Sequence, residues 1–329
     1  MDRFRLLQLP SLALQAVLEF HDPFELFDLS QCSKNSTAIV RLAGTKHYKL
    51  SLESERVVVN EKYRFETCRY SNLLQEKRSF SLTNGNKIFV HVGCYRRCRD
   101  RFLFIDSDSG LQVILFHLIE IFGCRIDSID TRPTFPGKIQ RSIMELVIKK
   151  QKEIKSLTIR ENLTQKDMTW ILDNLTIIDY CKCAVETSPD FGYGFKTYPR
   201  MLCIDYSHWF KLEDLYAAAK SCISIQLFDS KLRNKDIDVF MKLWVSGIFP
   251  TLRLLEVRNE DFNQWDQILG RNPRQFWNNN RAVVREKIII DGQFLGHDNG
   301  VKFRRADGIE VKIEMNWGQH ESYFRLYVL

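Results

Sequence analysis

The chain has 329 residues, of which 44% are hydrophobic and 27% are charged, and its formal net charge is +7 at pH 7. These values are ordinary for a soluble globular protein, and no apolar run approaches the roughly 20 residues that a membrane-spanning helix needs. The modest positive charge permits an acidic partner without requiring nucleic acid. The length suffices for two domains, or for a small module joined to one long domain.

The cysteines and the first residues indicate a compartment. The nine cysteines are scattered and odd in number, which favours reduced thiols in the cytosol or nucleus. The opening sequence MDRFRLLQLP contains no long apolar stretch and no small-residue cleavage site, so we do not expect secretion. We therefore expect a cytoplasmic or nuclear protein that does not bind a membrane.

Residues 4–42 contain the patterns of three short helices. Leu9-Pro10 stands at the start of the first helix. Proline is tolerated there, because the backbone amide that it lacks would have no hydrogen-bond partner in the first turn. His21-Asp22-Pro23 ends this helix, since the residue before a proline is disfavoured in the α region. Ser30 or Ser33 can cap the third helix. Helices this short gain most of their stability from packing, so they need either the rest of the chain or a partner.

The order of these patterns resembles an F-box. A Leu-Pro pair is followed by four apolar positions, a break at Asp-Pro and the sequence FELFDLSQCSK. The resemblance implies that the module docks on the Skp adaptor of a Skp–cullin–F-box ubiquitin ligase. An ordinary helical hairpin packed on its own domain is the alternative. The residues that the resemblance places at the adaptor are Leu9, Pro10, Leu12, Val17, Leu18, Phe24, Leu26, Leu29 and Cys32.

Residues 46–110 favour a β-rich connector. Short runs of Val, Leu and Phe alternate with turn residues, and Asn84-Gly85-Asn86 predicts a hairpin because a positive φ costs these residues little. Cys94 and Cys98 lack the further Cys or His pair of a zinc finger, so we expect no metal there. A solvated basic loop is the preferred interpretation, and a phosphate or nucleic-acid contact is the alternative. Its basic residues are Arg96, Arg97, Arg99 and Arg101.

From Leu111 helix-like stretches alternate with brief strand-like ones, and the strands recur every twenty to thirty residues. This spacing is typical of leucine-rich and related solenoids, in which a strand and a helix form each repeat. We expect a leucine-rich-repeat-like α/β domain, with an ordinary α/β layer as the alternative. Residues 271–329 revert to strand patterns, which predicts β-strands that close the domain.

Three pieces of this region carry a second resemblance: WILDNLTI (170–177), CIDYSHWFKLEDLYAAAKSC (203–222) and SKLRNKDIDVFMKLWVSGIFPTLRLLEV (230–257). Together they resemble the F-box-associated domain type 2 of the large nematode F-box group, over most of residues 110–270. Within the last piece, Asn234 or Asp236 can cap a helix that ends at Gly247.

The sequence thus predicts an α+β chain with a three-helix F-box (1–45), the connector (46–110) and an F-box-associated repeat-like domain (111–329) closed by strands (271–329). It contains no nucleophile elbow, phosphate loop or zincin helix, so we expect no enzyme, no cofactor and no metal. Cys181 and Cys183 are expected to place one thiol in the core and one outside.

The two resemblances imply a substrate-recognition adaptor that joins a target protein to the Skp adaptor and a cullin. A protein-interaction module without a ligase role and a phosphate or nucleic-acid binder are the alternatives. Clustered aromatic residues are common at binding hot spots, so we expect the target near the loop 206–213. The candidate target-binding residues are Tyr206, His208 and Trp209.

Overall fold

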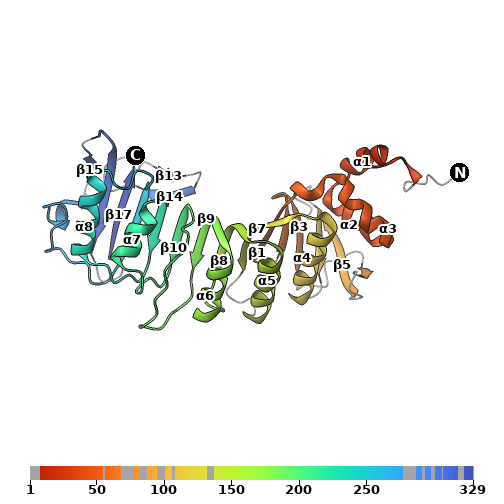
Figure 1. The fold of residues 1–329 in the computed structure, drawn as a ribbon, viewed down its shortest axis with the longest axis horizontal. Helices are drawn as coiled ribbons and strands as arrows, with labels where there is room; N and C mark the ends of the chain where they lie inside the picture. Colours follow the sequence, from red (N-terminus) through yellow and green to blue (C-terminus); the bar gives the residue numbers. More distant parts are fainter. Residues whose placement is uncertain are drawn as a thin grey trace. The chain divides into compact units, whose positions relative to one another are not determined.

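A computed structural model describes most of the chain (Figure 1). The described residues are 8–54, 56–67, 77–81, 87–94, 101–105, 108–131, 137–276, 287–290, 293–297, 301–305, 307–317 and 322–328. The chain divides into two compact units, unit 1 (Met1–Ile154) and unit 2 (Lys155–Leu329). Within the described ranges, no helix has the length and apolar character that crossing a bilayer requires.

Unit 1 begins with three short helices, α1 (Ser11–Glu19), α2 (Pro23–Cys32) and α3 (Lys34–Val40). Asp22 is the N-cap of α2. Its Oδ1 accepts hydrogen bonds from the backbone N–H groups of Phe24 and Glu25, each at 2.9 Å. Ser33 caps α3 by accepting the N–H of Ser36 at 3.0 Å, so Ser33 rather than Ser30 fulfils the predicted role. The 3₁₀ turns η2 (Arg41–Ala43) and η3 (Thr45–His47) follow.

The rest of unit 1 is a mixed sheet with two helices. Its strands are β1 (Lys49–Ser54), β2 (Arg56–Val59), β3 (Tyr63–Thr67), β4 (Lys77–Ser81), β5 (Lys87–Cys94), β6 (Arg101–Ile105) and β7 (Arg125–Thr131). Their order in the sheet is β7-β1-β2-β3-β6-β5-β4. The antiparallel pairing of β4 with β5 confirms the predicted hairpin, although its turn at Asn84-Gly85-Asn86 lies outside the described residues. The sequence did not predict β3 or β6.

Helices α4 (Asp108–Phe122) and α5 (Gly137–Lys150) complete unit 1. The apolar face of α4 is fully buried, and it includes Leu111, Ile114, Leu115, Leu118, Ile121 and Phe122. From α2, the rings of Phe24 and Phe27 meet Phe65 of β3 edge-on at 5.1 and 5.5 Å. The N-terminal helices therefore share one hydrophobic core with the strands that follow them.

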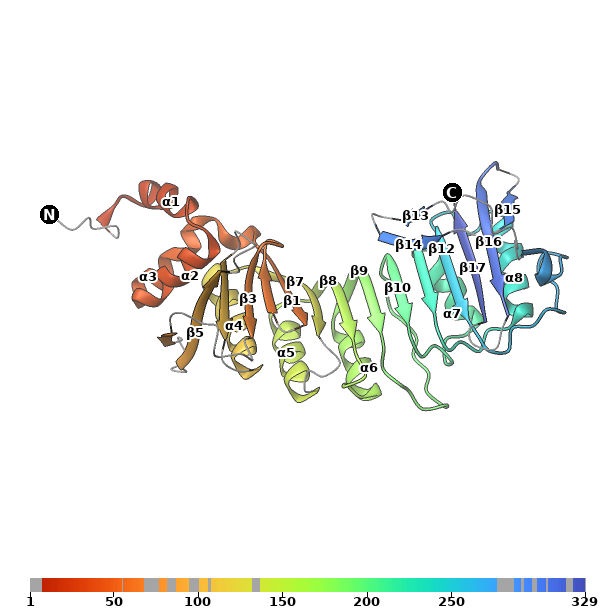
Figure 2. The same cartoon turned by 180° about the vertical axis from the view of Figure 1, so that it is seen from behind.

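Unit 2 alternates strands and helices: β8 (Glu153–Ile159), α6 (Gln165–Asn174), β9 (Thr176–Cys183), β10 (Met201–Ile204), α7 (Leu212–Ala219), β11 (Ser224–Leu227), α8 (Asn234–Val245) and β12 (Leu254–Arg258). Strands β9 to β12 are parallel and lie side by side in chain order. Helices α6, α7 and α8 cover one face of this sheet (Figures 1 and 2). The mixed α/β architecture agrees with the alternation of patterns in the sequence.

The C-terminal strands extend this sheet in antiparallel order, so that each runs opposite to its neighbour. They are β15 (Val301–Arg304), β16 (Glu310–Asn316) and β17 (Tyr323–Val328), and β17 pairs antiparallel with β12. Between the short helix η5 (Pro273–Phe276) and β15, the strands β13 (Lys287–Ile290) and β14 (Gln293–His297) form a separate antiparallel ribbon. The turn predicted at Asp291-Gly292 and residue Ala306 lie outside the described residues.

The core of unit 2 lies between the sheet and its helices. Alternate strand residues point at the helices, and two registered rows of them are buried: Leu202, Ile225, Leu255, Leu326 and Ile313, then Ile204, Leu227, Val257, Phe324 and Met315. On α8 the ring of Phe240 stacks on Phe249 at 5.0 Å. Arg233 occupies the N-cap position of α8, so the predicted cap at Asn234 or Asp236 was wrong, although Asp236 accepts the N–H of Arg233 from the third helical position. Gly247 with φ +88° follows the end of α8, as predicted.

We predict that a chain ending at Gly270 aggregates. Without β17 the edge of β12 is unpaired, and the apolar side chains that face Leu326 and Phe324 lose their cover. Size-exclusion chromatography and thermal melting beside the full-length chain test this expectation. A soluble truncated chain that melts sharply would show that the C-terminal strands are dispensable.

Candidate partner-binding surfaces

Helix α1 has two apolar sides. Leu14 and Leu18 face inward, at 5% and 0% exposure. Leu12 and Phe20 face outward, at 81% and 89% exposure, and the exposed Ala16 lies between them. These three residues are spaced by four, so they form one stripe along the helix, which we call the outer stripe. The inner side alone packs on unit 1, which leaves the outer stripe available to a partner.

The residues that the F-box resemblance places at the adaptor occupy different environments. Leu18, Phe24 and Leu26 are buried within unit 1, so their side chains support the helices from inside. Pro10, Leu12 and Cys32 are exposed, whereas Leu9, Val17 and Leu29 are half-buried. Phe20 was not among the predicted residues, although its four-residue spacing from Ala16 and Leu12 indicates a shared helix side.

A buried histidine joins α2 to α4. The Nε2 of His117 lies 2.7 Å from Nε2 of Gln31, so the ring nitrogen accepts this hydrogen bond when His117 is neutral. The ring also meets Phe27 edge-on at 5.6 Å. Burial lowers the pKa of His117, and the charge of Glu120 opposes this shift. Protonation would replace the acceptor with a second donor facing Gln31, so the contact favours the neutral ring.

Two further contacts fix the end of α4. The hydroxyl of Thr45 donates to the carbonyl of Phe122 at 2.7 Å, and Arg41 Nε donates to the carbonyl of Glu120 at 3.0 Å. Both donors satisfy carbonyl groups that the last turn of a helix leaves open. The turn η2, which contains Arg41, also packs on α1. The helix that presents the outer stripe is therefore held in place through η2 and α4.

The predicted target-binding loop lies between β10 and α7. Trp209 is buried at 4% exposure, with its ring 5.2 Å from that of Phe191, and so belongs to the core. His208 is half-buried, and its Nε2 lies 3.1 Å from the carbonyl oxygen of Ser188. Tyr206 is also half-buried. Of the three predicted residues, only Tyr206 and His208 therefore offer surface to a target.

The Cys181–Cys183 prediction was wrong, because both thiols are buried. Residues two apart in a strand point to the same face, and the two sulfurs lie 3.7 Å apart. The hydrogen bond with Cys183 and burial both raise the pKa of Cys181, so the Cys181 thiol is not poised as a nucleophile. Among the described residues, no cluster of three or more His, Cys, Asp or Glu side chains is arranged to hold a metal.

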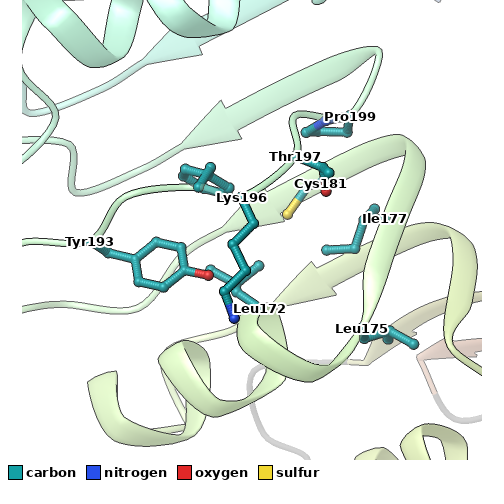
Figure 3. Close-up of a pocket in the computed structure, with 9 residues that line it drawn as sticks. Leu172, Leu175, Ile177, Cys181, Tyr193, Lys196, Thr197 and Pro199 are labelled. Atoms are coloured by element: carbon teal, nitrogen blue, oxygen red, sulfur yellow. The ribbon is translucent and has the colours of Figure 1, made fainter.

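Cys181 also lines a small cavity, where its sulfur points inward (Figure 3). The volume is about 10 Å³, which is about the room that one water needs, so the cavity cannot hold an organic ligand. Lys196, which lines the cavity, forms an ion pair with Asp173 at 3.0 Å.

Of the predicted basic loop, Arg96, Arg97 and Arg99 lie outside the described residues, and Arg101 begins β6.

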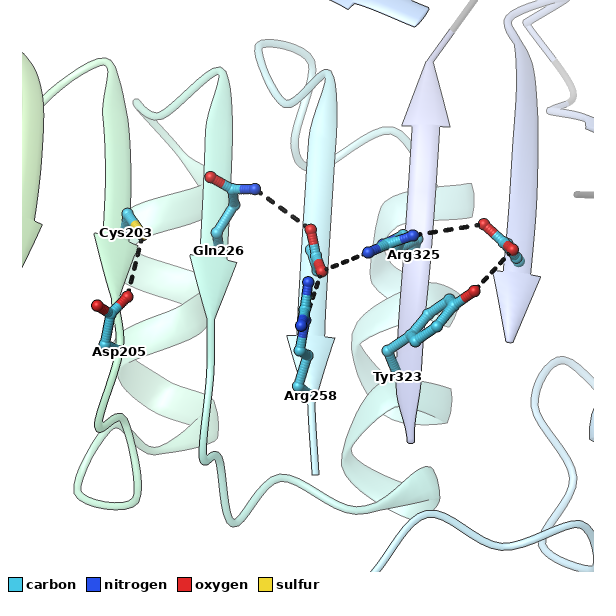
Figure 4. Close-up of polar contacts among 8 residues, drawn as sticks. Cys203, Asp205, Gln226, Arg258, Tyr323 and Arg325 are labelled. Carbon is cyan, nitrogen blue, oxygen red and sulfur yellow. Dashed lines mark hydrogen bonds and ion pairs between the residues drawn. The ribbon is translucent and has the colours of Figure 1, made fainter. Parts of the chain in front are cut away.

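On the sheet face opposite α7 and α8, polar side chains form one registered row (Figure 4). Glu256 is buried and accepts hydrogen bonds from Arg258 Nε at 2.8 Å and Arg325 Nη2 at 2.9 Å. Arg325 also approaches Glu314 at 3.8 Å, and Glu314 accepts from the hydroxyl of Tyr323 at 2.8 Å. Burial raises the pKa of Glu256, but the charge and hydrogen bonds of Arg325 and Arg258 outweigh it, so the net shift is downward. This ionic row links β12 to β17 and β16.

Residues 196–257 match a family model described as F-box associated. Unit 2 contains an F-box-associated domain. The matched residues extend from the segment before β10 to β12, so they include Tyr206, His208 and Glu256. The resemblance noted in the sequence extended over most of residues 110–270, and its piece at 170–177 lies outside the matched range. No curated protein and no solved structure matches the chain.

We predict that unit 1 loses stability as the pH falls below about 6.5. The folded pKa of His117 lies below its unfolded value, so the unfolded chain binds more protons in this range. The contribution is therefore complete above the unfolded pKa and is lost as the pH falls through the folded one. Calorimetric melting of the wild type and His117→Gln between pH 7.5 and 5 measures the effect, with His208→Gln in unit 2 as control. An unchanged pH dependence in His117→Gln would contradict the assignment.

We predict that Arg325→Met destabilises unit 2 strongly. The substitution removes the cation beside the buried Glu314 and one of the two cations beside Glu256, and losing one partner of a buried ion pair costs about 3–5 kcal/mol. For a unit of this size the melting temperature should fall by roughly 6–20 °C. The control is Arg304→Met, which removes an exposed ion pair with Glu310 and should cost at most about 1 kcal/mol. Equal effects of the two variants would refute a structural role for the ionic row.

Proposed function

We propose that this chain is a substrate-recognition adaptor of a Skp–cullin–F-box ubiquitin ligase. The outer stripe of α1 would dock on the Skp adaptor, and unit 2 would bind the target. The observation that carries the proposal is the pair of exposed side chains Leu12 and Phe20, on a chain that also contains an F-box-associated domain. The F-box resemblance of residues 1–45 supports the same assignment.

The packing of α1 supports docking through the outer stripe. An exposed apolar stripe on an anchored helix is typical of a protein–protein contact. Because Leu14 and Leu18 already hold the helix against unit 1, the partner need not order α1 when it binds. Of the residues that the resemblance implies, Leu9, Pro10, Leu12, Val17 and Cys32 would then contribute to the contact, and Phe20 joins them.

The proposed mechanism is proximity. The chain would hold a target near a ubiquitin-conjugating enzyme and would supply no catalytic side chain of its own. We further propose a nematode-type member of the F-box group, active in the cytoplasm or nucleus. A leucine-rich-repeat-like interpretation of unit 2 is supported by the parallel strands β9 to β12, which lie in chain order.

We predict that Leu12→Asp combined with Phe20→Asp strongly weakens binding to a recombinant Skp adaptor. Burying two such side chains contributes about 3–6 kcal/mol, so the dissociation constant should rise by a factor of about 100 or more. Isothermal titration measures the change. The variant should keep its melting temperature, because both side chains are exposed.

Two control variants separate docking from folding. Ile248→Asp changes an exposed apolar residue of unit 2 and should leave adaptor binding unchanged. Leu18→Asp places a charge in the core and should disrupt both the melting of unit 1 and adaptor binding. Retention of wild-type affinity by the Leu12/Phe20 variant would reject the outer stripe, and absence of any adaptor binding by the wild type would reject the ligase role.

A further inference from the structure

The loop after β12, residues 259–276, presents a tryptophan to solvent. Trp265 is 70% exposed, whereas Trp209 and Trp244 of the same unit are buried. It lies beyond the F-box-associated match and carries no sequence motif, being a single aromatic residue in the polar run NQWDQ. Exposed tryptophan and arginine side chains are the types most enriched at binding hot spots.

A buried asparagine fixes the backbone beneath this tryptophan. Asn234 of α8 is fully buried, and its Nδ2 donates to the carbonyl groups of Asn263 at 2.9 Å and Asp266 at 3.1 Å. Its Oδ1 accepts the N–H of Asn263 at 3.2 Å. The Oδ1 of Asn263 in turn accepts the N–H groups of Trp265 and Asp266, each at 2.9 Å. The position of Trp265 is therefore set on folding, which lowers the entropy cost of binding through it.

The same loop holds a strained residue. Leu269 has φ +51°, in the left-handed region that disfavours a side chain with a Cβ. Its N–H donates to Oδ1 of Asp238 at 2.8 Å, and Ile268 and Arg271 exchange backbone hydrogen bonds around it. A residue in this conformation costs about 1–3 kcal/mol, and such residues cluster at functional sites. The strain at Leu269 therefore marks the loop as a candidate functional segment with a defined backbone shape.

Arg274 completes the surface. Its guanidinium carbon lies 5.6 Å from the centre of the Trp265 ring, and its Nε donates to Oε1 of Gln264 at 2.7 Å. Its Nη2 donates to the same oxygen, so the Nη1 side of the guanidinium is the one that faces a ligand. Within the described part of unit 2, Arg258 and Arg325 pair with carboxylates, but Arg274 has no such ion pair. A guanidinium held against an aromatic ring keeps N–H groups that match a carboxylate. We call Gln264, Trp265 and Arg274 the Trp265 surface.

We propose that the Trp265 surface binds a peptide segment of the target protein in which a carboxylate side chain lies beside a large apolar one. The apolar side chain would pack on the indole ring, and Arg274 would bind the carboxylate. Nucleic acid fits less well, because Arg274 is one cation beside an exposed Glu260, whereas a polyanion needs several phosphate contacts.

This inference rests on the proposed function, since it identifies where the target would bind. It is tested separately from ligase docking. A random-peptide phage library is panned on the full-length chain, and the recovered peptides are synthesised and titrated by fluorescence anisotropy. Adaptor binding is measured on the same protein preparations, and it should be equal in the wild type and in every variant of the Trp265 surface.

The recovered peptides should carry Asp or Glu next to Phe, Trp, Leu or Met. Trp265→Ala should weaken their binding at least tenfold, while Trp265→Phe should retain most of it. Arg274→Ala should also weaken binding at least tenfold, but only for the acidic peptide and not for its Asn or Gln counterpart. The control is Ile248→Ala, which truncates another exposed apolar side chain of unit 2 and should bind as the wild type does.

Four results would overturn the inference. The first three are a library that yields no peptide, peptides whose affinity is unchanged in Trp265→Ala, and peptides without an acidic residue. Binding of a single-stranded oligouridine that depends on Trp265 would also overturn it, in favour of nucleic acid. Any of these results alongside intact adaptor binding removes this inference and leaves the proposed function in place.

Discussion

The packing of α1 through one side only is the constraint on which the proposed function depends. A nine-residue helix is marginal alone, and Leu14 and Leu18 supply the contacts that hold it. With that side buried, Leu12 and Phe20 must point outward. The anchoring continues through α2, where His117 of α4 contacts Gln31. An adaptor would thus meet a preformed surface, because the apolar side chains that define it do not also have to hold the helix.

In unit 2, as in α1, the residues that stabilise the fold differ from those that are exposed to a partner. The parallel strands and their helices bury the apolar rows, and the ionic row through Glu256 joins the antiparallel strands to them. The most exposed aromatic side chain of the described part of unit 2, Trp265, lies on a loop, the segment 259–276 that Asn234 fixes. A rigid scaffold with loops held by buried polar groups is well suited to present aromatic anchors.

Local patterns allowed the helices to be predicted, since proline, capping residues and apolar spacing act within a few residues of chain. Asn84-Gly85-Asn86 likewise predicted the pairing of β4 with β5. What could not be predicted depends on contacts distant in sequence. An apolar residue such as Leu26 or Leu12 has the same sequence signal whether its partner is the chain itself or another protein. Trp265 lies in a loop whose backbone is held by Asn234, thirty-one residues earlier in the chain. The arrangement of Cys181 and Cys183 does follow from the local sequence. In a strand, residues two apart point to the same face, so both thiols are buried together and neither lies outside.

The most direct test of this account is amide hydrogen exchange of the full-length chain with and without a recombinant Skp adaptor. The account predicts added protection concentrated in residues 9–20, where the outer stripe lies, with the amides of β9 to β12 unchanged. Adaptor binding that protects unit 2 and leaves α1 unchanged, or no protection anywhere, would contradict it.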